Sequence, residues 1–163
     1  MPCDDERWMH RAIELARQGA AKPGANPIGC VIVRDGEVLG EACNEVELHF
    51  DPTAHAEIMA IRRAGARLQC HELRGAVLYS TLQPCAMCTA ASIWAKIGHI
   101  VFGAGRDDVH PMYFDERHLN TADFVRDAFR DDLALRGGVL ADLCARLYLP
   151  PDAVVPRDLQ INR

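Results

Sequence analysis

The chain has 163 residues, of which 49% are apolar and 25% charged, the composition of one globular domain. No stretch reaches the roughly 18 uninterrupted apolar residues of a membrane span, and the acidic start MPCDDERW does not resemble a signal peptide. A net charge of −5 argues against a large polyanionic partner, so nucleic acid is a disfavoured ligand but stays open. We therefore expect a cytoplasmic protein whose seven cysteines are reduced and either bind metal or fill the core.

In chain order, the first elements are a helix and a hairpin. Apolar residues at helical spacing predict a helix over residues 4–19, with acidic residues at its start. Two apolar runs, 28–33 and 38–43, flank the turn dipeptide Asp35-Gly36 and predict a β-hairpin. A second helix is expected over 54–64, where Asp51-Pro52-Thr53 supplies the cap.

The rest of the chain alternates between strands and helices. We predict, in order, a strand at 76–80, a helix at 85–95, a strand at 97–103, a helix at 121–129, a strand at 133–135 and a helix at 139–148. This alternation favours an α/β fold with helices on both sides of a mixed sheet. The sequence thus indicates a single domain over residues 1–148, followed by a proline-rich tail, 149–163, that we expect to be extended.

Two short segments carry residues suited to metal chemistry, His55-Ala56-Glu57 and Pro84-Cys85-Ala86-Met87-Cys88. Histidine and cysteine are preferred zinc ligands, and three protein ligands leave a fourth position for water. Cys85 and Cys88 are three residues apart, on one helix face, in a first turn that stabilises thiolates. The segments therefore predict one Zn²⁺ per chain, held by His55, Cys85 and Cys88.

Glu57 adds a carboxylate to this predicted site. On an ideal helix it would lie about 200° away from His55, but near a helix start both side chains can reach the same space. Zinc lowers the pKa of a coordinated water towards 7, and a carboxylate beside the metal can pass that proton to a ring nitrogen and a leaving amine. The pair of segments also matches the H-x-E…P-C-x-x-C signature of zinc deaminases, so we expect hydrolytic deamination with Glu57 as the catalytic proton carrier.

A structural zinc site is the alternative interpretation of the same segments. It would make the chain a non-catalytic, zinc-stabilised domain, and it would need a fourth protein ligand, for which Cys70, His71 or His49 could serve. Such a site has no use for an acid two residues after the histidine, which favours the catalytic interpretation.

With these motifs, the sequence resembles the cytidine-deaminase-like superfamily, in the branch of bacterial guanine deaminases, tRNA adenosine deaminases and fungal-type cytosine deaminases. The resemblance runs from about Trp8 to Tyr148. It implies a three-layer α/β/α sandwich around a five-stranded mixed sheet, zinc on the three ligands above, proton transfer by Glu57, and a homodimer. The segments 51–60, 78–82 and 98–104 look much like those of tRNA adenosine deaminases. They hold the metal or form the core, however, so they say little about the substrate.

Other residues favour a free purine base as the substrate. Trp94 matches a tryptophan of guanine deaminases and would stack on a base, or else fill the core. Phe114-Asp115-Glu116 resembles a guanine deaminase segment, which implies that Glu116 contacts the purine and assists proton transfer, with Asp115 beside it. Asn44 stands where relatives hydrogen-bond the base, with a plain turn residue as the alternative. Phe50 would either stack on substrate or anchor its loop.

The composition of the C-terminal part also favours a free base over an RNA substrate. Residues 122–163 hold seven Asp, six Arg and no Lys, whereas phosphate recognition needs unpaired cations. The chain departs from the guanine deaminase pattern at Gln83, where Glu is usual, and at Tyr113, where a small residue is usual. These departures leave other heterocyclic bases open as substrates. We expect a deaminase that converts guanine to xanthine and ammonia, with tRNA adenosine, or cytosine or an aminotriazine, as alternative substrates.

Overall fold

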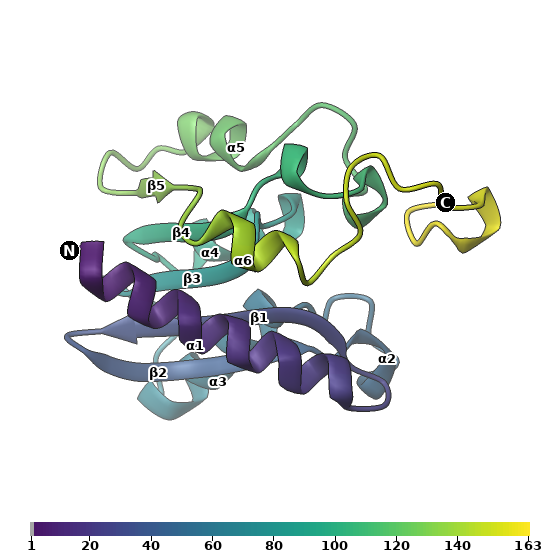
Figure 1. Ribbon diagram of the computed structural model, residues 1–163. Helices are drawn as coiled ribbons and strands as arrows, with labels where there is room; N and C mark the ends of the chain where they lie inside the picture. The colour runs from purple at the N-terminus through teal and green to yellow at the C-terminus, as the bar shows by residue number, and fades with distance from the viewer. Residues whose placement is uncertain (1) are drawn as a thin grey trace.

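The computed structural model describes residues 2–163, with side chains from Asp4 onward, and contains a five-stranded sheet in the order β2-β1-β3-β4-β5. The strands are β1 (Asn26–Arg34), β2 (Glu37–Asn44), β3 (Val77–Leu82), β4 (His99–Ala104) and β5 (Ala134–Arg136). The helices are α1 (Pro2–Ala21), α2 (Val46–His49), α3 (Ala56–Leu68), α4 (Ala86–Trp94), α5 (Thr121–Asp127) and α6 (Ala141–Ala145). Figure 1 shows their arrangement along the chain.

The sheet is mixed, as predicted. β1 pairs antiparallel with both β2 and β3, whereas β3, β4 and β5 run parallel. The β1–β2 turn has positive φ at both Asp35 (53°) and Gly36 (77°), the backbone that suits a two-residue hairpin. Because β3 and β4 are parallel, their carboxyl ends meet at one edge of the sheet, and α4 begins directly beyond β3.

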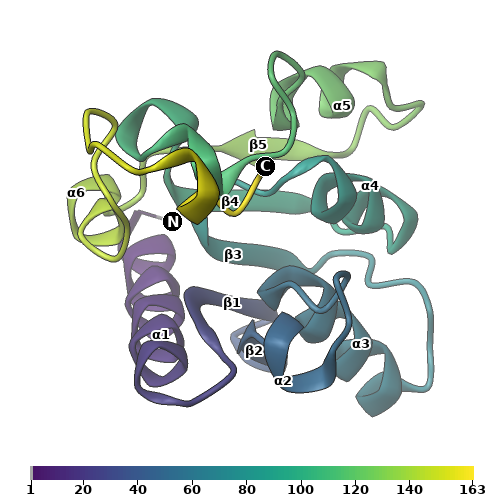
Figure 2. The same cartoon turned by 90° about the vertical axis from the view of Figure 1, so that its right-hand side faces the viewer.

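Helices cover both faces of the sheet and make three layers, which Figure 2 shows edge-on. Side chains alternate along each strand, so Val31 and Val33 of β1 join the core under α1 and α6. Their neighbours Cys30 and Ile32 join a second core under α3 and the end of α4. The fold is therefore the predicted α/β/α sandwich with a five-stranded mixed sheet.

Two glycines let helices lie directly on the sheet backbone. A Cβ at Gly29 would stand 1.9 Å from the carbonyl oxygen of Ala12 in α1, and one at Gly40 would stand 2.4 Å from that of Ala60 in α3. No heavier residue fits at either position without moving a helix. The hairpin is thus clamped between α1 on one face and α3 on the other.

Several boundaries differ from the sequence expectation. The helix predicted over residues 54–64 is α3, and it continues to Leu68. Gln69, which adopts the left-handed conformation (φ 50°), caps its end. The last helix is shorter than predicted, because Leu140 is left-handed (φ 53°) and cannot belong to it. The short helix α2 was not predicted, since four residues carry too little periodicity to recognise. No helix within residues 2–163 is long and apolar enough to cross a bilayer.

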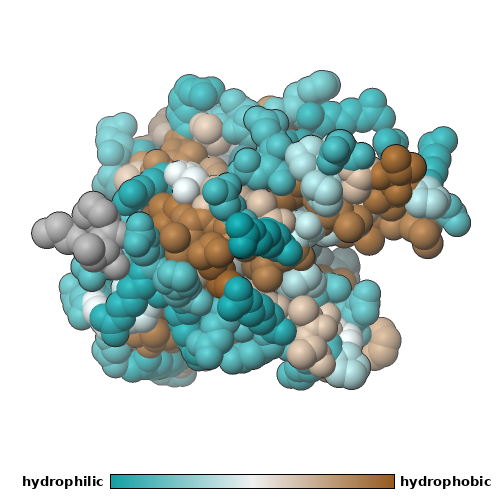
Figure 3. Space-filling view, viewed as in Figure 1, coloured by the Kyte–Doolittle hydropathy of each residue, from teal (hydrophilic) through white to brown (hydrophobic). Residues whose placement is uncertain are grey.

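The C-terminal tail departs from the expected extended form. It contains a 3-10 helix, η3 (Arg157–Leu159), and folds back so that the side-chain amide of Asn162 donates to the carbonyls of Pro111 (3.1 Å) and Phe114 (2.9 Å). These long-range bonds have no signal in local sequence. The tail also exposes the apolar side chains of Val154, Leu159 and Ile161. Figure 3 shows brown residues at the right edge, the side on which Figure 1 places the tail.

Candidate active site and metal centre

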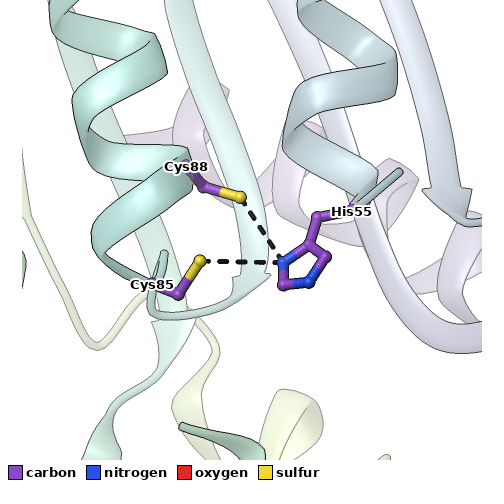
Figure 4. Close-up of side chains that lie close together, drawn as sticks. All are labelled: His55, Cys85 and Cys88. Carbon is purple, nitrogen blue, oxygen red and sulfur yellow. Dashed lines mark hydrogen bonds between the residues drawn. The ribbon is translucent and has the colours of Figure 1, made fainter. Parts of the chain in front are cut away.

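The three predicted metal ligands come together where two helices begin. His55 is the N-cap of α3 and Cys85 the N-cap of α4, and Cys88 lies in the first turn of α4. His55 Nδ1 is 3.6 Å from the Sγ atoms of both Cys85 and Cys88, as Figure 4 shows. Zinc bonds of about 2.3 Å to sulfur and about 2.0 Å to nitrogen, at a tetrahedral angle, place such ligand atoms about 3.5 Å apart. The cluster therefore fits Zn²⁺.

Within residues 2–163, only these three side chains place their ligand atoms all within 4.8 Å of one another. Of the residues considered as a fourth ligand, His49 Nε2 bonds Glu45 Oε2 at 2.8 Å, and the exposed Cys70 donates to the carbonyl of Glu72. Like these two, His71 brings no ligand atom into the cluster. Three protein ligands with an open position are the pattern of a catalytic zinc site and not of a structural one.

The surroundings favour the thiolate that zinc needs. Hydrogen bonds from the Cys88 thiol and from His55 lower the pKa of Cys85 to about 4, against an opposing effect of burial, and the backbone N–H of Cys88 contributes in the same direction. The hydrogen bond with Cys85 raises the pKa of His55, and the negative charges of Glu57 and Asp115 add to this. Cys85 is thus prepared to bind a cation, whereas the hydrogen bond with Cys85, and then burial, raise the pKa of the Cys88 thiol.

Glu57 lies against the cluster, in a buried position. Only 4% of the residue is exposed; its Oε1 accepts a hydrogen bond from Ser80 Oγ at 2.9 Å, and its Oε2 is 3.5 Å from Cys88 Sγ. Burial, and then the charge of Cys85, raise the pKa of this carboxyl, which suits a group that takes up and releases a proton. The angular separation expected on a helix does not apply, because His55 precedes the helix as its cap.

The loop after β4 brings a second carboxylate to the same place. Glu116 Oε1 accepts a hydrogen bond from the backbone N–H of Ala86, the residue after Cys85, at 3.1 Å. This N–H is one of the unpaired donors of a helix start, and the helix dipole there favours a negative charge. Asp115 is exposed, and its charge is felt at His55. Both acids predicted from the sequence therefore reach the site region.

Asn44 ends β2 and is buried near the start of the loop to His55. Its Oδ1 accepts from the backbone N–H of Val46 (3.2 Å) and from Asn26 Nδ2 (3.4 Å), which is the arrangement of a turn residue. Among residues 2–163, no hydrogen bond is found from its own Nδ2. The amide therefore shapes the turn and keeps a donor for another group, so both interpretations of Asn44 are compatible with its position.

The two aromatic residues predicted to contact substrate lie on the surface. Phe50 follows α2 with φ 53° and is 94% exposed. Trp94 is the last residue of α4, is 81% exposed and lines a groove with Ile61 and Ala91. The helix has nine residues, so its last residue lies about 12 Å from the end that carries the ligands. Within the described chain, neither ring packs on the His–Cys cluster, and their contacts with substrate stay predictions.

Ser80 and Gln83 were not predicted as site residues. Ser80 is completely buried in β3 and donates to the Glu57 carboxylate. The sequence carried no signal for it, because Tyr79 and Thr81 on either side also bear hydroxyls. Gln83, which stands just before the Pro-Cys motif, accepts a hydrogen bond from the backbone N–H of Arg106 through Oε1 at 3.1 Å. At this position, where relatives usually have Glu, the uncharged amide of Gln83 thus accepts the hydrogen bond from Arg106.

A His–Cys–Cys cluster at two helix starts, with a buried carboxylate beside it, is the pattern of zinc-dependent hydrolytic deaminases. Residues 2–104 match the family model of the cytidine and deoxycytidylate deaminase zinc-binding region, so the chain belongs to this family of hydrolases that act on C–N bonds.

Known relatives include enzymes on two kinds of substrate. The chain is 38% identical over 114 residues to a guanine deaminase of Bacillus subtilis (70% of this chain, 73% of that protein). It is 36% identical over 148 residues to a tRNA-specific adenosine deaminase of Haemophilus influenzae (87% and 79%). A solved guanine deaminase from Nitrosomonas europaea is also similar, with a TM-score of 0.76 and 27% identity over 87% of this chain and 81% of that one.

Proposed function

We propose that the protein deaminates a free nucleobase and converts guanine to xanthine and ammonia. The observation that carries this proposal is the Glu116 carboxylate at the start of α4, with Asp115 next to it. The N1–H and amino groups of guanine are donors, and a carboxylate is an acceptor only. Adenine, in contrast, presents an unprotonated N1 at the corresponding place, which would oppose a carboxylate.

The side chains divide the work as follows. His55, Cys85 and Cys88 hold the metal, which when bound supplies an activated water at neutral pH. Glu57 would take the proton that this water releases and give it to a ring nitrogen, and would then take the second proton from the added oxygen and give it to the leaving amine. Burial raises the pKa of this carboxyl, which suits a group that accepts and releases protons in turn. Ser80 fixes the other oxygen of this carboxylate, so one oxygen is left to move the proton.

Asn44 and Glu116 orient the base in this proposal. The Nδ2 group of Asn44 donates to an acceptor on the ring, and Glu116 accepts from the donor edge. A base bound between them would face the cluster from the open end of the sheet, while Phe50, on the neighbouring loop, is free to close over it.

The arginines around the loop before α3 support a small substrate over an RNA. Arg62 pairs with Asp51 at 3.2 Å, and Arg63 with Glu45 at 2.8 Å. Each cation is already neutralised by an acid of its own chain, whereas RNA binding gains its affinity from cations that are free to meet phosphates. We therefore assign tRNA adenosine as the second candidate substrate, favoured by the longer alignment with the Haemophilus enzyme.

The deciding experiment measures ammonia released by the zinc-loaded protein from guanine, cytosine, an aminotriazine and an anticodon stem-loop in parallel. We expect turnover of guanine above the other three. Turnover of the RNA alone would overturn the free-base proposal in favour of the second candidate. A fully metallated protein that is inactive on all four would indicate a zinc-stabilised domain instead.

We further propose that the protein works in the cytoplasm, in purine metabolism, as a homodimer of single deaminase domains (residues 1–148) that each bear a tail (149–163). The support for a dimer is the apolar groove of about 490 Å³ around Trp94, on the outer surface of α3 and α4. An exposed tryptophan in such a groove is typical of a protein interface.

A further inference from the structure

Arg106 makes an unusual set of contacts for a half-buried cation. It is the first residue of the 3-10 helix η1 (Arg106–Asp108), directly after β4. Among residues 2–163, no carboxylate forms an ion pair with it; its guanidinium donates to backbone carbonyls of the loop that follows, at Leu119 (2.8 Å) and at Glu116. The guanidinium carbon also lies 4.7 Å above the ring of the buried Phe114.

These contacts fix the shape of the loop that bears Glu116. Carbonyl oxygens that converge on one point repel each other unless a group with several donors lies between them. The guanidinium has five N–H donors in a planar fork, and its flat face stacks on Phe114, so it satisfies both requirements at once. A positive charge alone would not satisfy these two requirements. The contacts of Arg106 therefore differ from the surface ion pairs elsewhere on the chain.

The same residue is tied to the metal-ligand segment through its backbone. The N–H of Arg106 donates to Gln83 Oε1 at 3.1 Å, and Gln83 N–H in turn donates to the carbonyl of Ala104 at 2.8 Å. The loop returns to that segment at two more points: Glu116 accepts from Ala86 N–H, and Thr121 Oγ1 donates to the carbonyl of Pro84 at 2.8 Å. Residues 83–86 and 114–121 are thus held together by a closed set of bonds.

We propose that Arg106 is a positioning residue for Glu116. It holds the main chain at and after Glu116 and the ring of Phe114 before it, so that the carboxylate stays at the start of α4 and faces the donor edge of the bound base. Arg106 itself touches neither the base nor the metal ligands. The inference rests on the proposed function only for its kinetic consequence, because the placement of Glu116 against Ala86 is a property of the protein without substrate.

A double-mutant cycle on the zinc-loaded protein tests the kinetic consequence. We expect Arg106→Ala to lower kcat/KM for guanine about tenfold or more, mainly by raising KM, with zinc content unchanged. In a Glu116→Ala background, the same change should lower kcat/KM by less than about twofold, because the group being positioned is gone. Arg106→Lys should recover only part of the loss, since it keeps the charge but not the fork. Arg126→Ala, at an exposed arginine of α5, is the control and should behave as wild type.

Hydrogen exchange tests the positioning without any substrate. If Arg106 acts as proposed, exchange in the peptide that contains Ala86 should rise in Arg106→Ala as much as in Glu116→Ala, and no further in the double variant. Unchanged protection of this peptide in Arg106→Ala, or independent kinetic losses that multiply, would overturn the inference. If wild type turns over no free base, the proposed function has failed, and the exchange result alone decides the role of Arg106. If Arg106→Ala does not fold, Arg106→Lys carries both measurements.

Discussion

At the residue scale, Glu57, the proposed proton carrier, lies beside the metal ligands without being one of them. The carboxylate is not among the three side chains that converge on the metal position, and its Oε1 is engaged by Ser80 at 2.9 Å. It can therefore be removed without removing a ligand. The three ligands and this acid were all predicted from the sequence, because each lies within a few residues of its partner in a short motif.

We accordingly expect Glu57→Ala to bind zinc at one ion per chain yet to lose about 10²–10⁴-fold in kcat, the usual contribution of a general acid–base. Metal content by elemental analysis and turnover by ammonia release check this. Ser80→Ala is the companion variant, with a smaller loss, because the carboxylate remains but is less well fixed. Near-full turnover of Glu57→Ala would show that another group carries the proton.

Residues whose roles arise from tertiary contacts were beyond the sequence. Ser80 meets Glu57 only because α3 packs on β3, and Arg106 meets its partners only because the loop after η1 folds back beside the ends of β3 and β4. No local pattern records such contacts. Trp94 was recognised in the sequence, but its surroundings were not. A helical repeat shows which residues share a face, and it does not show which end of the helix faces a neighbour. The sequence also left Asn44 open between turn and ligand, and the structure is compatible with both.

At the element scale, the loop from β2 to α3 is held by the buried Glu45. Its carboxylate, in a residue only 4% exposed, accepts two bonds from Arg63 at 2.8 and 3.0 Å and one contact from His49 at 2.8 Å. Burial acts to raise its pKa, but these hydrogen bonds outweigh it and leave the pKa below the usual 4.5. The loop that delivers Asn44 and His55 to the site is therefore fastened to α3 by an ionised group.

Glu45→Gln should reduce the free energy of unfolding at pH 7 by about 1–2 kcal/mol, a value discounted because Arg63 is partly exposed. Since the folded-state pKa of Glu45 lies below its unfolded value, its contribution is fully present above pH 4.5 and is lost as the pH falls through the folded-state pKa. The difference between wild type and variant should thus shrink on acidification. Urea unfolding at a series of pH values measures it, and a pH-independent difference would contradict this account.

The packing of α1 on β1 gives a second prediction for an element. Gly29→Ala places a methyl group 1.9 Å from the carbonyl oxygen of Ala12, so the helix must move, and we expect a loss of about 1–3 kcal/mol in the free energy of unfolding. Gly98→Ala is the matched control, because its Cβ would meet nothing closer than 3.5 Å. Urea unfolding of both variants compares them, and equal stabilities would show that α1 does not rest on the strand backbone as described.

Most of the elements were predicted from the sequence, since a period of 3.6 residues is visible in α1, apolar runs around a turn dipeptide mark β1 and β2, and a cap marks the start of α3. Errors concentrate where a boundary depends on backbone conformation and not on side-chain pattern, as at Leu140, or where an element is a single turn, as in α2. The tail was misjudged for a third reason. Its three prolines favour extension locally, but the bonds of Asn162 to the loop at residues 111–114 decide its path.

At the scale of the whole molecule, the net charge of −5 is reflected in how the arginines of α3 are paired. Arginines of α3 that could have formed a basic surface pair with acids on the neighbouring strand and loop. The arginines of α3 are thus held in intramolecular pairs, while the carboxylates of Glu57 and Glu116 lie at the candidate site. This distribution suits an uncharged heterocycle, and an apolar groove lies elsewhere, around Trp94.

This groove leads to a prediction about assembly. Trp94 is 81% exposed, and its neighbours in the groove include Ile61, Ala90 and Ala91, small or apolar groups that a second copy of the chain could cover. We expect wild type to have the mass of two chains in light scattering after gel filtration, and Trp94→Glu to shift to one chain, because a carboxylate would be buried without a partner. Phe129→Glu, at another exposed aromatic residue outside the groove, should stay dimeric.

The same variants decide between two roles for the tryptophan. If Trp94→Ala keeps the mass of wild type but raises KM for guanine, the substrate contact predicted from the sequence is favoured over the interface. If wild type itself has the mass of one chain, the proposed dimer is wrong, and the exposed ring needs another partner. A change in both mass and KM would mean that assembly and substrate binding are linked through α4, whose first turn carries two of the metal ligands and whose last residue is Trp94.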